Sequence, residues 1–169
     1  GNHFHYVLCL SEAKGMDITM DLDDLLNNTL GEFFLECVGD KIEEVSELPK
    51  MLEDIYYLDN KQEFISKTTN CEILDIEDSC VESYCVKENE IHIQYELEFI
   101  LQTFIDSEFI WRVQGCAQVE LSIPDTSLVD WSVFDMEDDD FFEQYEKHKE
   151  FVRFQNIVYS QIECDTLYV

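Results

Sequence analysis

The residues of this chain with the clearest capacity for chemistry are carboxylates, and the densest group is the run Asp135-Met136-Glu137-Asp138-Asp139-Asp140. Calcium is a hard cation that prefers several carboxylate oxygens, so this run could hold one. An EF-hand calcium loop needs Gly at its sixth position and Glu at its twelfth. Counted from Asp135, the sixth position is Asp140 and the twelfth is Glu146, so the glycine requirement fails. The run therefore favours a solvated loop, or an acidic patch for a protein partner, over a specific cation site.

Two further groups have spacings that could bind a metal ion. His3 and His5 would share one face of a strand, and with Cys9 or a distant carboxylate they could ligate zinc. Cys80 and Cys85 are separated by four residues, but no second pair of cysteines completes a zinc motif. The two histidines can also be polar side chains of a strand, and the two cysteines can be buried or half-buried thiols without a metal. We predict no metal site and no cofactor.

Signatures of catalysis are sparse. The chain has no Gly-x-Ser-x-Gly and no glycine-rich phosphate loop, and only five glycines in all. A metal-dependent nuclease usually also needs basic residues to hold the phosphodiester, and here they are scarce. The best acid–base arrangement is His92, Glu96 and Glu98 on one face of an expected strand, which the polar face of a sheet explains as well. We predict no catalytic residue.

One helix is expected over residues 21–38. Apolar residues recur there at helical spacing, from Leu22 to Val38, with acidic and amide residues on the other face. Asp21 suits the N-cap, Gly39 suits the C-terminal stop, and Gly31 lies inside. Residues 41–58 predict a second helical region, with Pro49 opening its main helix.

From about residue 62 the apolar period changes from 3.6 to 2. The pattern predicts strands over residues 71–77, 80–87, 90–105, 109–123 and 151–163, besides a first strand at 3–10. The connection Asp106-Ser107-Glu108 is short, so the strands at 90–105 and 109–123 should form a long hairpin. Each long strand has one apolar and one polar face, which is typical of an antiparallel sheet covered on one side. The expected fold class is α+β: an antiparallel sheet of long strands in the C-terminal two-thirds, packed against one or two N-terminal helices.

The bulk composition predicts a single acidic domain over residues 1–169. The formal net charge is −29, while 46% of the residues are hydrophobic, which is enough to bury a core. Seven cysteines are an odd number, and no signal peptide or membrane span is evident, so a cytoplasmic protein with reduced thiols is expected. The chain begins Gly1-Asn2 without an initiator Met, which suggests that it was excised from a longer chain.

The acidity favours a non-enzymatic protein-interaction domain that engages a basic protein partner. Direct binding to nucleic acid or to an anionic membrane is disfavoured by charge repulsion. Carboxylates about 5–6 Å apart on a helix could imitate a phosphate ladder, so a nucleic-acid mimic, an inhibitor or an immunity protein would fit. The residues expected to bind the partner are Asp21, Asp23, Asp24, Glu32, Glu36, Asp135, Glu137, Asp138, Asp139 and Asp140. The oligomeric state is not indicated.

A second interpretation is an accessory or regulatory domain of a larger bacterial protein. The stretch from Val129 to Asp138 resembles the acidic, aromatic β-rich regions that follow PIN-like nuclease domains. The resemblance covers about a third of the chain and carries over no catalytic residue. A cation-binding protein or an enzyme of unknown type is the third interpretation.

Overall fold

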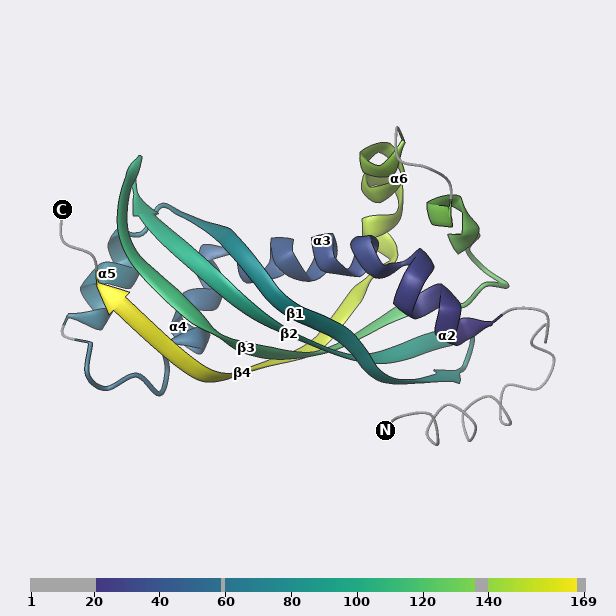
Figure 1. Cartoon of the computed structure of the whole chain (residues 1–169), viewed down its shortest axis with the longest axis horizontal. Coiled ribbons are helices and arrows are strands. Elements are labelled where there is room, and N and C mark those ends of the chain that lie inside the picture. Colours follow the sequence, from purple (N-terminus) through teal and green to yellow (C-terminus); the bar gives the residue numbers. More distant parts are fainter. Residues whose placement is uncertain (1–20, 59, 136–139, 167–169) are drawn as a thin grey trace. The chain divides into compact units, whose positions relative to one another are not determined.

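The computed structural model describes residues 21–58, 60–135 and 140–166. Four long antiparallel strands lie side by side in the order β1-β2-β3-β4, so each strand pairs with the next one in the chain (Figure 1). The strands are β1 (Asn70–Lys87), β2 (Glu90–Ile105), β3 (Glu108–Pro124) and β4 (Arg153–Thr166). Several helices precede this sheet in the chain, which confirms the predicted α+β class. No helix among the described residues is long and apolar enough to span a membrane.

Two-residue turns connect the first three strands. Glu88 and Asn89 have φ values of 55° and 64°, and two positive values in succession match the natural twist of a hairpin. Asp106, with φ of 56°, and Ser107 join β2 to β3. The predicted long hairpin over these two strands is therefore confirmed.

The alternating patterns of β2 and β3 are confirmed, with one exception. Residues from Ile91 to Leu101 on one face of β2 are buried, as are those from Trp111 to Ile123 on one face of β3, apart from the half-buried Gly115. Ser122 alternates with Leu121 and Ile123, which predicts an outward side chain, yet it is fully buried. Gln155 of β4 donates from Nε2 to its hydroxyl at 2.8 Å, so a neighbouring strand covers it.

The prediction of two short strands at 71–77 and 80–87 is wrong, because β1 is continuous. The buried side of β1 changes parity along the chain: Cys71 is buried, then Val81, and then Tyr84 and Val86. A strict period of 2 cannot fit such a pattern, so the sequence alone suggests a break. At the other end, residues 149–151 form a 3₁₀ turn, and β4 begins two residues later than predicted.

The chain forms two compact units, and each contains part of every strand. Among the described residues, the first unit comprises 21–37, 80–96, 119–135 and 140–157, and the second comprises 38–58, 60–79, 97–118 and 158–166. The helical elements are α2 (Leu22–Asp24), the π-helical turn η1 (Leu25–Thr29), α3 (Gly31–Ile42), η2 (Val45–Glu47), α4 (Leu48–Met51), α5 (Lys61–Lys67), η3 (Trp131–Asp135), α6 (Phe141–His148) and η4 (Lys149–Phe151).

The predicted helix over 21–38 begins as expected but is not regular. Asp21 caps it by accepting a hydrogen bond from Asp24 N, at 3.3 Å. The side chain of Asn27 then donates to Asp23 O and competes with the helical backbone bond, and Leu30 N bonds Leu25 O five residues back.

Gly31 and Gly39 also differ in role from the prediction. Gly31 begins α3 after the π-helical turn, and Gly39 does not end α3, which continues to Ile42. A Cβ on Gly39 would lie 3.4 Å from Ile73 Cδ1, so this residue is a packing position in the helix.

In the first unit, the N-terminal half of α3 packs on both the sheet and an aromatic cluster. The ring of Phe34 lies 6.0 Å from that of Tyr95 in β2. Phe33 lies 5.3 Å from Trp131 and 5.8 Å from Tyr145, which come from η3 and α6. Trp131 and Tyr145 are buried, so this aromatic cluster extends the core of the unit. The helix α6, which follows the acidic run, is not among the elements predicted from the sequence.

In the second unit, helical turns are tied to the strands by polar side chains. Pro49 lies in the first turn of α4, as predicted. Lys61 Nζ donates to Leu52 O at 3.0 Å and to Ile55 O at 3.1 Å, so a lysine at the start of α5 holds the turn that follows α4. The period change placed near residue 62 is wrong by several residues, because α5 continues to Lys67.

Candidate partner-binding pocket

The strongest candidate site is a pocket of about 410 Å³ in the first unit. One wall comes from the helical segment at the start of the described chain, and the other comes from the segment that follows β3. The lining residues are Asp21, Asp24, Leu25, Thr29, Thr126, Val129, Asp130, Trp131, Ser132 and Asp135. Two segments far apart in sequence thus converge on one hollow.

Local hydrogen bonds hold the carboxylates of the pocket in place. Asp21 accepts from Asp24 N, and Asp24 Oδ1 accepts from Asn28 Nδ2 at 2.6 Å. Asp130 Oδ1 accepts from Ser132 N at 3.0 Å and from the Ser132 hydroxyl. These two bonds lower the pKa of Asp130, so its charge is favoured.

The same pocket has apolar parts. Trp131 and Leu25 contribute to its lining although each is almost fully buried, and Val129 is half-buried. Trp131 is fixed because its indole N–H donates to Pro124 O at 2.8 Å, at the end of β3. The pocket therefore combines an apolar lining with hydroxyls and carboxylates.

All the charges that line the pocket are negative. Four aspartates and no lysine, arginine or histidine are among the lining residues. In the described part of the chain, no three His, Cys, Asp or Glu side chains come close enough to hold a metal ion. A cationic group attached to a longer molecule suits this arrangement better than a bare ion that needs converging ligands.

The structure separates the residues that the sequence grouped together as partner-binding. Asp21, Asp24 and Asp135 line the pocket. Asp23 does not line it, and its Oδ1 accepts from Asn27 Nδ2 at 2.9 Å. The others do not line the pocket either: Glu32 is exposed and Glu36 is half-buried on α3, while Asp140 is exposed before α6. Glu137, Asp138 and Asp139 lie outside the described residues, as do His3, His5 and Cys9.

Asp130 is the acidic pocket residue that sequence reasoning missed. Its signal was local: in Asp130-Trp131-Ser132 the aspartate accepts the amide two residues on, which is an Asx-turn. Asp125-Thr126-Ser127 repeats this arrangement, with Ser127 N donating to Asp125 Oδ1 at 3.0 Å. Two Asp-x-Ser triplets in succession mark an ordered segment after β3.

Among residues 21–58, 60–135 and 140–166, the other chemical groups singled out from the sequence form no comparable site. His92 lies 3.6 Å from Glu90, whereas Glu98 belongs to the second unit and lines a shallower hollow of about 260 Å³ there. Cys85 is half-buried as predicted, but Cys80 is exposed, on the side of β1 opposite to the buried Val81.

Burial makes two further thiols poor nucleophiles. Desolvation raises the pKa of Cys71 to about 12 and that of Cys164 to about 12. A thiol with such a pKa is almost entirely protonated at neutral pH, and the thiolate is the nucleophile.

No family model matches this chain, and neither a curated protein nor a solved structure is significantly similar to it.

Proposed function

We propose that this chain is a protein-interaction domain whose acidic pocket accepts a cationic side chain of a basic protein partner. The observation that carries the proposal is the convergence of Asp21 and Asp24 with Asp130 and Asp135 around one partly apolar hollow. Neither segment alone would present these groups together. Local hydrogen bonds orient three of the four carboxylates before any ligand arrives.

Lysine and arginine fit the chemistry of the pocket. Each has a long apolar stem and a charged end, so the stem can contact Leu25, Val129 and Trp131 while the charge meets the aspartates. The hydroxyls of Thr29 and Thr126 add acceptors for the remaining N–H groups. An arginine would use the pocket best, because its planar fork donates to several acceptors at once.

The net charge of −29 supports a basic partner independently of the pocket. A negative field of this size attracts a positive surface and raises its rate of association. It also disfavours nucleic acids and anionic lipids as direct ligands. In the sharper form of the proposal, the partner is a basic nucleic-acid-binding protein and this chain competes with its nucleic acid.

A flexible peptide of alternating arginine and glycine is a suitable probe, because glycine disfavours strand formation. We expect the double variant Asp24→Asn/Asp135→Asn to bind it about tenfold more weakly than the parent chain. The control Glu53→Gln/Asp54→Asn removes the same charge from two exposed positions of the second unit and should change the affinity by less than about twofold. Calorimetric titration at low ionic strength measures both.

An equal loss of affinity in the two variants would show that the general field, and not the pocket, attracts the peptide. Absence of peptide binding by the parent chain would contradict the proposal altogether. For the mimicry version, the chain should displace DNA from a basic DNA-binding protein, and raising the salt concentration should weaken this competition steeply. Competition that does not depend on the salt concentration would contradict nucleic-acid mimicry but not the binding of a basic partner.

A further inference from the structure

The outer edge of β1 is a second surface that could receive a partner. β1 is at one end of the strand order, and within the described part of the chain no strand lies on its outer side. The backbone of such an edge can pair with any extended segment through N–H and C=O groups. In the second unit this edge comprises Asn70–Ser79.

One position of the edge is already occupied by a side chain. Glu43, just after α3, accepts a hydrogen bond from Ile73 N at 2.8 Å through Oε2. The carboxylate oxygen stands in for the carbonyl that a neighbouring strand would supply. A hydrogen-bond acceptor can therefore reach the outer side of β1. Glu43 occupies this position at Ile73.

Beyond Ile73 the strand is uncovered. The side chains of residues 74–79 are exposed, except for that of Ile76, which is half-buried. Leu74 is a large apolar residue and retains 50% of its surface exposed. Both faces of this short stretch are therefore accessible to an added segment.

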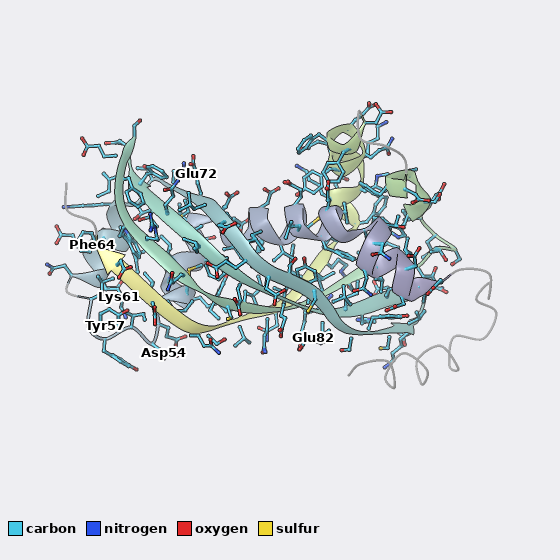
Figure 2. The ribbon with its side chains drawn as sticks, viewed as in Figure 1. Asp54, Tyr57, Lys61, Phe64, Glu72 and Glu82 are labelled. Atoms are coloured by element: carbon cyan, nitrogen blue, oxygen red, sulfur yellow. The ribbon has the colours of Figure 1, made fainter. Side chains whose placement is uncertain are left out.

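The charge along this edge is uniformly negative. Glu72, Asp75, Glu77 and Asp78 lie between Asn70 and Ser79, and that range contains no lysine or arginine. Glu72 is exposed and can be followed on β1 in Figure 2. In natural sheets, lysine at a free edge often discourages pairing with other strands. Carboxylates at this edge repel acidic strands but attract basic ones.

We infer that the edge from Leu74 to Ser79 binds an extended, basic segment of a protein partner as an added strand. The inference rests on the proposed function in that the partner is basic, but its site lies in the second unit. Main-chain hydrogen bonds would supply affinity, and lysine or arginine at alternate positions would pair with Asp75, Glu77 or Asp78 across the strands.

Other occupants fit this edge less well. A second copy of β1 would place its own carboxylates near these, and like charges on adjacent strands are destabilising. A nucleic acid strand would meet the same repulsion. An apolar strand would pair its backbone but leave the charges of the edge without partners.

The test uses the whole chain and a short capped peptide of alternating lysine and valine. Two further peptides carry backbone N-methyl groups, one on all lysines and the other on all valines. A strand bound by one edge points only alternate N–H groups at β1, so one methylation pattern should weaken binding at least about tenfold while the other is tolerated. The amide resonances of residues 74–79 should shift on titration with the unmethylated peptide.

A charge variant provides the second arm. Glu77→Lys/Asp78→Lys should weaken binding of the unmethylated peptide at least about tenfold, whereas the matched control Glu53→Lys/Asp54→Lys should alter it by less than about threefold. Equal affinities for the two methylated peptides, equal effects of the two variants, or no binding by the parent chain would each overturn the inference. Glycine disfavours strand formation by the arginine–glycine peptide, so loss of its pocket-dependent binding would contradict the proposed function without affecting this result.

Discussion

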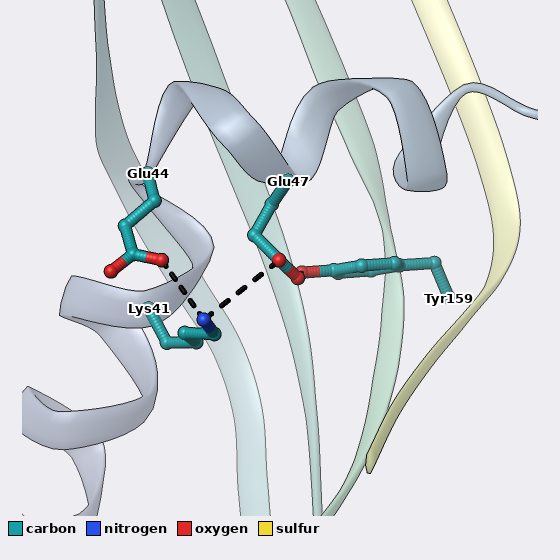
Figure 3. Close-up of polar contacts among 4 residues, drawn as sticks. All are labelled: Lys41, Glu44, Glu47 and Tyr159. Carbon is teal, nitrogen blue, oxygen red and sulfur yellow. Dashed lines mark hydrogen bonds and ion pairs between the residues drawn. The ribbon is translucent and has the colours of Figure 1, made fainter. Parts of the chain in front are cut away.

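Tyr159 lies in an environment that differs strongly from that of a tyrosine in water. Its hydroxyl donates to Glu47 Oε1 at 2.7 Å, and Lys41 Nζ lies 3.0 Å from Glu44 and 4.0 Å from Glu47 (Figure 3). The contact ties β4 to the helical turn η2 within the second unit. We predict that Tyr159→Phe lowers the free energy of unfolding by about 1 kcal/mol, since one hydrogen bond is lost at constant packing.

Urea unfolding measures this change, with Tyr56→Phe as the control. Tyr56 retains 86% of its surface exposed, and its hydroxyl should contribute less than about 0.5 kcal/mol. Equal effects of the two substitutions would contradict the assignment of a stabilising bond at Tyr159.

The same contact predicts a pH dependence. Burial, followed by the hydrogen bond and charge of Glu47, raises the pKa of Tyr159 above the usual value of 10.0. The folded state therefore favours the neutral phenol, and its contribution to stability is complete below pH 10.0 and lost as the pH rises above it. We expect the stability of the parent chain to fall more steeply above pH 10.0 than that of Tyr159→Phe, as measured by unfolding at several pH values.

Glu43 offers a test of charge against hydrogen bonding. Burial raises the pKa of Glu43, while its bond from Ile73 N opposes this shift and the nearby Asp40 and Glu72 add to it. Glu43→Gln keeps an oxygen acceptor and removes a repelled charge, so the free energy of unfolding at pH 7 should be unchanged or slightly higher. Glu43→Ala should lower it by about 1 kcal/mol, because the Ile73 amide loses its acceptor. A larger loss in Glu43→Gln than in Glu43→Ala would contradict this reasoning.

Among the elements, the contact of β3 with β4 depends on one glycine. A Cβ on Gly115 would lie 3.0 Å from Ser160 O and 3.2 Å from Ile162 Cα, which are backbone atoms. Gln161, between them, has a φ of 54°, so β4 is locally irregular there. Gly115→Ala should therefore destabilise the chain by about 1–3 kcal/mol through forced backbone movement.

Gly39 in α3 is the matched comparison. The nearest atom to its added Cβ would be a flexible methyl of Ile73 at 3.4 Å. Gly39→Ala should leave stability unchanged or raise it by up to about 1 kcal/mol, because alanine favours the helix. Chemical denaturation measures the free energy of unfolding of both variants. A similar decrease in Gly39→Ala and Gly115→Ala would contradict this explanation.

The elements that sequence predicted well are those with an unbroken period. β2 is recovered at both ends, and the start of the helical region at Asp21 and Leu22 is confirmed. The failures occur where a local competition overrides the period. The Asn27 side chain donates to a backbone carbonyl in the region of η1, and the buried side of β1 changes between Val81 and Tyr84.

For the molecule as a whole, the net charge of −29 should limit stability. Repulsion among exposed carboxylates is screened by salt, with a Debye length that falls from about 30 Å at 0.01 M to about 3 Å at 1 M. We predict that the melting temperature rises when sodium chloride is increased from low to high concentration, by about 2–4 °C for each kcal/mol of repulsion removed. Differential scanning calorimetry measures it.

Calcium chloride at matched ionic strength is the control for this prediction. General screening predicts a similar rise in melting temperature with the two salts. A specific cation site would instead raise the melting temperature further at millimolar calcium. A melting temperature that does not depend on sodium chloride would contradict the role given to repulsion.

The acidity, the α+β class, the long hairpin and the cap at Asp21 can be predicted from the sequence, because they depend on composition or on patterns between near neighbours. The sequence also indicated three of the pocket aspartates, as part of two acidic segments. Two features become visible only in the folded chain: Asp21 and Asp24 line one pocket with Asp130 and Asp135, and Glu43 occupies one position of the β1 edge. These contacts join residues distant in the chain, and their formation depends on packing around Phe33 and on strand order, which local periodicity does not encode.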